Sequence, residues 1–100
     1  MVGMAVMDRR RVVRTELTES CTLKRRTGSA IRCETVDVCE GGMSVCSRRP
    51  LAPDEVLDFE LREITGRARV LRQHGHERYA LRFEQLGDQA RAELARIIAR

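Results

Sequence analysis

Two short groups of residues in this 100-residue chain carry side chains that suit the binding of an anionic ligand. The first is Arg10-x-x-x-Arg14, which lies in a run rich in arginine, and the second is Asp37-x-Cys39-x-x-Gly42. Either group alone is a weak signal, because arginine clusters are common and Asp followed by two glycines usually marks a turn. Together they supply two permanent cations, a carboxylate, a small polar side chain and open backbone.

The chemistry of these groups fits a ligand that has both phosphates and a guanine base. A guanidinium is planar and always charged, and it can bond two phosphate oxygens, or O6 and N7 of guanine, at once. In an extended chain Arg10 and Arg14 point to the same side, because strand side chains alternate with period two. Asp37 can accept from the N1 and N2 donors of guanine, and Gly42 permits close approach and unusual backbone angles.

Length and composition limit the fold and the partners. One hundred residues predict a single domain with a modest core. The net charge of +4 favours anionic partners, but the arginines are spread over several segments and form no long basic tail. One Tyr, two Phe and no Trp argue against a stacking surface for single-stranded nucleic acid.

Other features exclude further classes of protein. The chain has no apolar stretch of ~20 residues for a membrane span, and its positive charges follow the short apolar start, unlike those of a signal peptide. We therefore expect a cytoplasmic protein whose four cysteines are reduced and, lacking C-x-x-C or zinc spacing, bind no metal. His74 and His76 flank Gly75 in an expected turn and do not indicate a metal site. No nucleophile–base set or pair of catalytic acids is evident, so we do not expect an enzyme.

Alternation of apolar and polar residues predicts a mainly β protein, a small six-stranded antiparallel barrel or curled sheet. The expected strands cover residues 17–24, 30–38, 43–47, 57–61, 64–70 and 79–83, of which the second alternates poorly. Arg78 and Arg82 are expected to face outward. The expected inward residues are Leu17, Cys21, Leu23, Met43, Val45, Leu57, Phe59, Leu61, Ile64, Ala68, Val70, Tyr79, Leu81 and Phe83.

The two ends of the chain differ from this pattern. Ala90, Leu94, Ile97 and Ile98 follow helical spacing and predict a helix over residues 88–100, with Asp88 as its N-cap. We expect this helix to cap one opening of the barrel. Residues 1–11 show no period and are expected to form a flexible basic arm, which leaves residues 12–100 as the single domain.

The two motifs together resemble the PilZ domain family, in which R-x-x-x-R is followed, across a strand, by D/N-x-S-x-x-G. Arg10 and Arg14 match the first motif. Asp37, Cys39 and Gly42 match the second, with cysteine where the family has serine. The resemblance covers nearly the whole chain and implies the family's small six-stranded β-barrel with a terminal helix.

The resemblance implies a receptor for cyclic di-GMP, the bacterial second messenger, with no other cofactor. Arg9 directly before the first motif implies a stacked pair of ligand molecules in one site. The arm would become ordered over the ligand and present a new surface to a protein effector. Carried to this chain, the ligand-binding residues are Arg9, Arg10, Arg14, Asp37, Cys39, Gly41 and Gly42.

Cys39 is the departure from the family pattern. A thiol is a poorer donor than a hydroxyl, and one hydrogen bond contributes ~0.5–1.5 kcal/mol net, so affinity falls about tenfold or less. One alternative is a PilZ-like adaptor that has lost nucleotide binding and binds only protein. Another is a small basic barrel that binds RNA or DNA, which the scattered arginines favour and the low aromatic content opposes. We expect no specific nucleic-acid partner and no membrane insertion.

Overall fold

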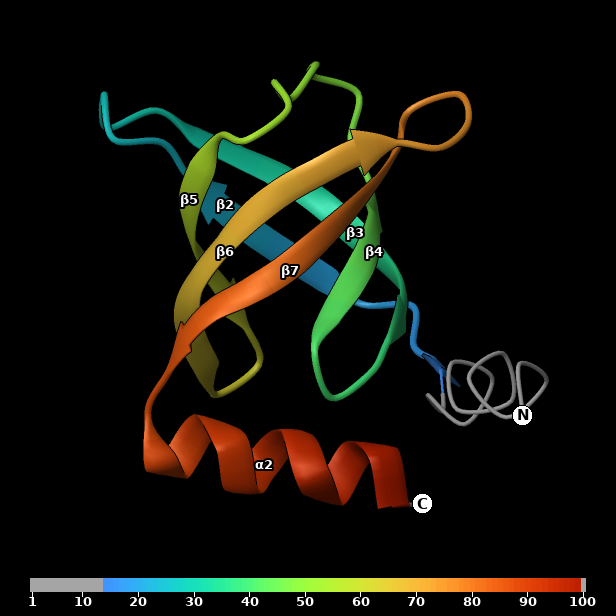
Figure 1. The fold of residues 1–100 in the computed structure, drawn as a ribbon, viewed down its shortest axis with the longest axis vertical. Coiled ribbons are helices and arrows are strands. Elements are labelled where there is room, and N and C mark those ends of the chain that lie inside the picture. Colours follow the sequence, from blue (N-terminus) through green and yellow to red (C-terminus); the bar gives the residue numbers. More distant parts are fainter. Residues whose placement is uncertain (1–13, 100) are drawn as a thin grey trace, which may run out of the picture.

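The computed structural model describes residues 14–99 and forms a closed antiparallel β-barrel with one helix across its end (Figure 1). Six strands close the barrel in the order β3-β2-β5-β6-β7-β4, with β4 pairing back to β3. The predicted six-stranded barrel and terminal helix are confirmed. Along the chain the elements are β1 (Thr15–Glu16), β2 (Ser20–Lys24), β3 (Ala30–Val38), β4 (Gly42–Cys46), β5 (Val56–Leu61), β6 (Ile64–Gln73), β7 (Arg78–Leu86) and α2 (Asp88–Ala99).

The short strand β1 is an addition to the predicted six. The alternation favoured one strand from Leu17 onward, whereas the ladder is interrupted between β1 and β2, although Leu17 and Glu19 keep backbone hydrogen bonds to β3. The Thr35 side chain explains the break: it accepts a hydrogen bond from the Glu19 N–H at 3.0 Å and donates one to the Leu17 carbonyl. The Thr35 hydroxyl thus supplies two hydrogen bonds that backbone groups would make in a regular ladder.

The barrel interior is filled by the residues that alternation predicted to face inward. All of them are buried except Phe83, which is partly buried and packs against the core. Its ring stacks on that of Phe59 with centroids 5.2 Å apart. Arg78 and Arg82 are exposed, as expected.

A bulge in β3 decides which side of the barrel Asp37 occupies. The pairing with β4 shifts by one residue between Thr35 and Asp37, so that Val36 is an extra residue. Without this shift Asp37 would share the inward side with Thr35, because strand side chains alternate. The bulge instead places Asp37 opposite Ser44 on the outer face and returns Val38 to the core. It accounts for the poor alternation of residues 30–38, and it avoids burying a carboxylate, which costs several kcal/mol.

Helix α2 covers one end of the barrel, as predicted, and packs against β6 (Figure 1). Its buried residues are Ala90, Leu94 and Ile97. The expected N-cap is off by one position, because the Gly87 carbonyl accepts the first helical bond from the Arg91 N–H at 2.9 Å. Asp88 lies instead in the first turn, where its charge complements the helix dipole. The expected last residue, Arg100, lies outside the described residues.

The four cysteines are all free thiols. Cys21, Cys33 and Cys39 are buried and Cys46 is half-buried, so most of them pack as small apolar side chains. A hydrogen bond with the neighbouring Cys33 thiol raises the pKa of Cys21, and burial raises it further. Cys21 is therefore a neutral thiol of the core.

The expected arm of residues 1–11, with Arg9 and Arg10, lies outside the described residues. In the described range, residues 14–99, no helix has the length and apolar character that crossing a membrane requires.

Candidate ligand-binding site

An ion pair between Arg14 and Asp37 joins the two sequence motifs. Arg14 directly precedes β1, and β1 pairs with the end of β3, where Glu16 lies opposite Asp37. Arg14 Nη1 donates to Asp37 Oδ1 at 3.0 Å, with the two side chains 57% and 21% exposed. An exposed pair of this kind contributes at most ~1 kcal/mol, so a ligand can displace it.

The Cys39–Gly42 segment is the turn that joins β3 to β4, and hydrogen bonds fix its backbone. The Cys39 N–H donates to the Gly42 carbonyl at 2.8 Å, and the Phe83 N–H donates to the Gly41 carbonyl at 2.8 Å. The turn is thus tied to β7 as well as to its own strands. Cys39 is 8% exposed, while Gly41 is exposed.

Gly42 is required by the close approach of two strands. A Cβ at this position would collide with the Leu81 carbonyl oxygen and would lie 3.2 Å from the Arg82 Cα. The backbone angles of Gly42 are ordinary, since the glycines with positive φ in the described chain are Gly28 and Gly75. The close approach of β4 and β7 therefore accounts for a glycine at this position, and the expected unusual φ is absent.

A shallow hollow of about 120 Å³ lies on the outer face beside this turn. It brings together four of the expected site residues, Arg14, Cys39, Gly41 and Gly42. Asp37 joins them through its ion pair with Arg14. The remaining two, Arg9 and Arg10, lie outside the described residues.

Two further residues of the hollow, Ser44 and Arg82, were not expected as site residues. Ser44 lies opposite Asp37 across the β3–β4 ladder, and Arg82 lies opposite Gly42 across the β4–β7 ladder. Ser44 follows Gly42 by two residues, so strand alternation places it on the outer face of β4. Its place on that face could therefore have been predicted from the sequence. The position of Arg82 depends on the register between β4 and β7, which no local pattern reveals.

Arg82 is held in place by an acidic neighbour. Its Nη2 donates to Glu84 Oε2 at 3.0 Å, and Arg69 Nη2 donates to the other carboxylate oxygen of Glu84 at 3.2 Å. The hydrogen bond from Arg69 and then that from Arg82 lower the pKa of Glu84 below its usual range. Glu84 therefore stays charged and keeps a second guanidinium beside the turn.

The arrangement offers complementary groups to a nucleotide. Arg14 and Arg82 can donate to phosphate oxygens, and the Asp37 carboxylate can accept from N–H groups at the edge of a base. Ser44 adds a hydroxyl that can donate or accept.

Comparison with protein-family models gave a match to the PilZ domain over residues 8–100. The matched range contains both the arginine motif and the segment from Asp37 to Gly42. A search of curated proteins found no match. The match covers nearly the whole chain and agrees with the closed six-stranded barrel and its terminal helix. The chain belongs to the PilZ domain family.

Proposed function

We propose that this protein is a receptor that binds cyclic di-GMP. Membership of the PilZ family implies a cyclic di-GMP receptor. The observation that carries the proposal for this chain is the contact of Arg14 Nη1 with Asp37 Oδ1 at 3.0 Å, because it joins the cation of one motif to the carboxylate of the other. The four free thiols favour a cytoplasmic location, where cysteines stay reduced.

Binding in this proposal is an exchange of partners. Arg14 turns from Asp37 to a phosphate or to the O6 and N7 edge of guanine, and Asp37 accepts from guanine N1 and N2. Cys39 stands at the turn as a weak donor in place of a hydroxyl. Arg82 and Ser44 complete the wall of the site.

The arm is the proposed moving part. Arg9 and Arg10 would add cations beside the ligand, and residues 1–11 would cover it, with charged contacts offsetting the cost of ordering them. The covered face would then be a new surface for a protein effector. Arg9 also favours a stacked pair of ligand molecules, so the proposed stoichiometry is two per site.

Isothermal titration calorimetry with cyclic di-GMP tests the proposal, with GTP as a control of similar chemistry. Each charge-assisted hydrogen bond contributes ~1.5–3 kcal/mol, so Arg10→Ala and Arg14→Ala should each weaken binding by roughly tenfold to a hundredfold. Arg26→Ala is the matched control, because Arg26 is exposed in the turn between β2 and β3, away from this hollow. Absence of heat at tens of micromolar protein would refute the proposal.

Limited proteolysis tests the role of the arm. Trypsin cleaves after arginine, so cleavage within the Arg9–Arg11 run should slow when cyclic di-GMP is added. Cleavage at an unchanged rate under saturating ligand would show that the arm does not cover it.

Cys39 favours a second candidate, an adaptor that keeps the fold and binds protein without nucleotide. The hollow between Glu40 and the Arg91, Leu94 and Ile98 side chains of α2 offers it a partly apolar surface. In that case a partner would be captured equally well by the Arg10→Ala/Arg14→Ala double variant, and cyclic di-GMP would have no effect.

A further inference from the structure

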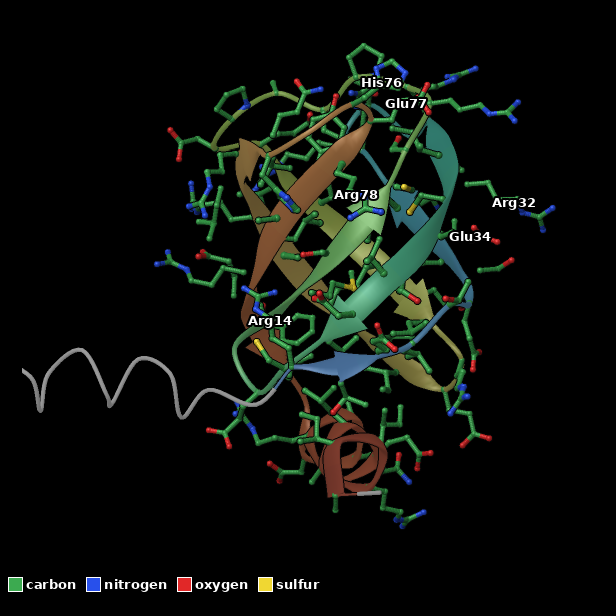
Figure 2. The ribbon with its side chains drawn as sticks, turned by 90° about the vertical axis from the view of Figure 1, so that its right-hand side faces the viewer. Arg14, Arg32, Glu34, His76, Glu77 and Arg78 are labelled. Carbon is green, nitrogen blue, oxygen red and sulfur yellow. The ribbon has the colours of Figure 1, made fainter. Side chains whose placement is uncertain are left out.

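A second hollow lies on the outer face of the barrel, at the ends of β3 and β4 away from the Cys39–Gly42 turn. It has a volume of about 670 Å³ and shares no lining residue with the hollow at Arg14. In Figure 2, Arg32, Glu34 and Arg78 lie on the barrel wall and Glu77 at its upper rim, whereas Arg14 lies lower, near the helix. We call this surface, together with the adjacent Arg78, the basic hollow; the charged lining residues are Arg32, Glu34, Arg48, Arg49 and Glu77, and Arg78 lies beside them, opposite the lining residue Cys46.

The strand register explains why these side chains lie on one face of the barrel. Glu34 on β3 lies opposite Cys46 on β4, which in turn lies opposite Arg78 on β7. These three side chains form one row on the outer face. Arg32 lies two residues before Glu34 and so shares its face. Arg48 and Arg49 follow β4 after Ser47 and line the same hollow.

In the described part of the chain, the arginines of the basic hollow form no ion pair, unlike several other arginines of the barrel. Arg69 and Arg82, for example, are both paired with Glu84. Within residues 14–99, no ion pair is formed by Arg32, Arg48, Arg49 or Arg78. Arginines that form no ion pair remain available to an anionic partner and attract it.

The two carboxylates of the basic hollow discriminate between anionic partners. Glu34 lies on the same face of β3 as Arg32, in a row with Arg78, and Glu77 lies at the rim. A nucleic-acid strand has a phosphate at every nucleotide and would meet Glu34 with like charge. The described lining also has no aromatic side chain on which a base could stack. A polypeptide can place acidic residues against the arginines and a neutral or basic residue against Glu34.

We propose that the basic hollow is the docking site for an acidic segment of a protein partner. The cations supply the attraction, and the carboxylates set the register of the bound segment. The site is separate from the proposed cyclic di-GMP site, although β3 and β4 contribute to both. The inference does not rest on nucleotide binding, because the surface exists without it.

Fluorescence anisotropy tests this site with a fluorescein-labelled peptide of alternating glutamate and serine, compared with one of alternating glutamine and serine. We expect saturable binding of the acidic peptide alone, at low salt. Exposed ion pairs contribute ~0.2–1 kcal/mol, or up to about fivefold each, and charge reversal adds repulsion. The Arg32→Glu/Arg78→Glu variant should therefore weaken binding by roughly tenfold or more.

The control variant is Arg26→Glu/Arg91→Glu, which changes the net charge equally at exposed arginines outside the basic hollow. This variant should bind the acidic peptide with an affinity within about twofold of the wild type, because distant exposed charges are screened. Equal loss in both variants would overturn the proposal, as would no saturable binding of the acidic peptide. Tighter binding of a labelled oligothymidylate, lost in the Arg32→Glu/Arg78→Glu variant, would assign the surface to nucleic acid instead.

Two measurements separate this inference from folding and from the proposed function. All four replaced arginines are exposed, so thermal unfolding should match the wild type, and the neutral Arg32→Gln/Arg78→Gln variant should lose part of the binding. Calorimetry with cyclic di-GMP should give the wild-type affinity in Arg32→Glu/Arg78→Glu. Loss of both ligands together would mean that the two hollows are one site and would overturn the assignment.

Discussion

Gly42→Ala should destabilise the barrel, whereas Gly41→Ala, one residue earlier, should not. At Gly42 an added Cβ meets the Leu81 carbonyl oxygen and carbon and the Arg82 Cα, which are all backbone atoms that no rotamer change can move. At Gly41 no heavy atom lies within 4 Å of an added Cβ. Neither glycine has a positive φ, so alanine meets no conformational penalty at either position.

The size of the effect follows from what must move. To accept a Cβ, β4 must separate from β7 where Gly42 lies opposite Arg82 and Met43 opposite Leu81. Overpacking of this kind costs ~1–3 kcal/mol. In a domain of this length each 1 kcal/mol lowers Tm by ~4–8 °C, so Gly42→Ala should lower it by roughly 5–20 °C. Gly41→Ala should leave Tm unchanged or raise it slightly, since alanine restricts the unfolded chain.

Urea unfolding followed by circular dichroism measures this difference, with a lower midpoint and an unchanged m-value expected for Gly42→Ala. Calorimetry with cyclic di-GMP then separates packing from binding. Wild-type stability in Gly42→Ala would refute the packing explanation. If ligand affinity fell while stability was kept, the glycine would act on the ligand directly.

Three further predictions concern single side chains. Cys39→Ser should tighten cyclic di-GMP binding in calorimetry by up to about tenfold, because a hydroxyl is the better donor, and weaker binding would contradict this. Ser44→Ala should weaken that binding by about tenfold or less with unchanged Tm, and an unchanged affinity would exclude a ligand contact. The pKa of Glu55 would be raised by burial, but hydrogen bonds from Arg25 Nε at 2.7 Å and the Ala52 N–H at 3.1 Å outweigh burial and lower it. The interaction of Glu55 with Arg25 therefore stabilises the fold at pH values above the ordinary pKa of a glutamate. This stabilisation is lost as the pH falls through the lowered pKa of Glu55. Glu55→Gln should cost up to ~1 kcal/mol at neutral pH and nothing in acid, and urea midpoints that shift equally at both pH values would contradict this.

The strands could be predicted wherever one face is apolar and the other polar. The alternation of Leu57, Phe59 and Leu61 gave the whole inward face of β5. The predicted strands 64–70 and 79–83 are too short, because β6 continues to Gln73 and β7 to Leu86. Their ladder shifts register between Val70 and Arg72 and again at Arg67/Ala68, so the pairing continues where alternation fails. Backbone hydrogen bonds hold these strand extensions, and such bonds cannot be predicted from the alternation of side chains.

The candidate site could be predicted only as far as its motifs extend. The chemistry of Arg14 and Asp37 suggested that the two serve one ligand, and the ion pair places them side by side. Ser44 and Arg82 could not be assigned in this way, because their positions arise from ladder register between separate strands. The basic hollow was missed for the same reason, since its arginines come from three separate parts of the chain.

Three structural features assemble the candidate site without a ligand. The bulge holds Asp37 on the outer face, Arg14 neutralises its charge, and Gly42 lets β7 bring Arg82 close to the turn. Under the proposed function, binding then requires an exchange of partners rather than the burial of new charges. Arg14 would give up a carboxylate for a phosphate or guanine, and Asp37 would give up a guanidinium for guanine N–H groups, so charge-assisted bonds are kept in number. One neutral hydrogen bond contributes about half as much as a charged one, which is why the cysteine at position 39 should lower affinity without abolishing binding.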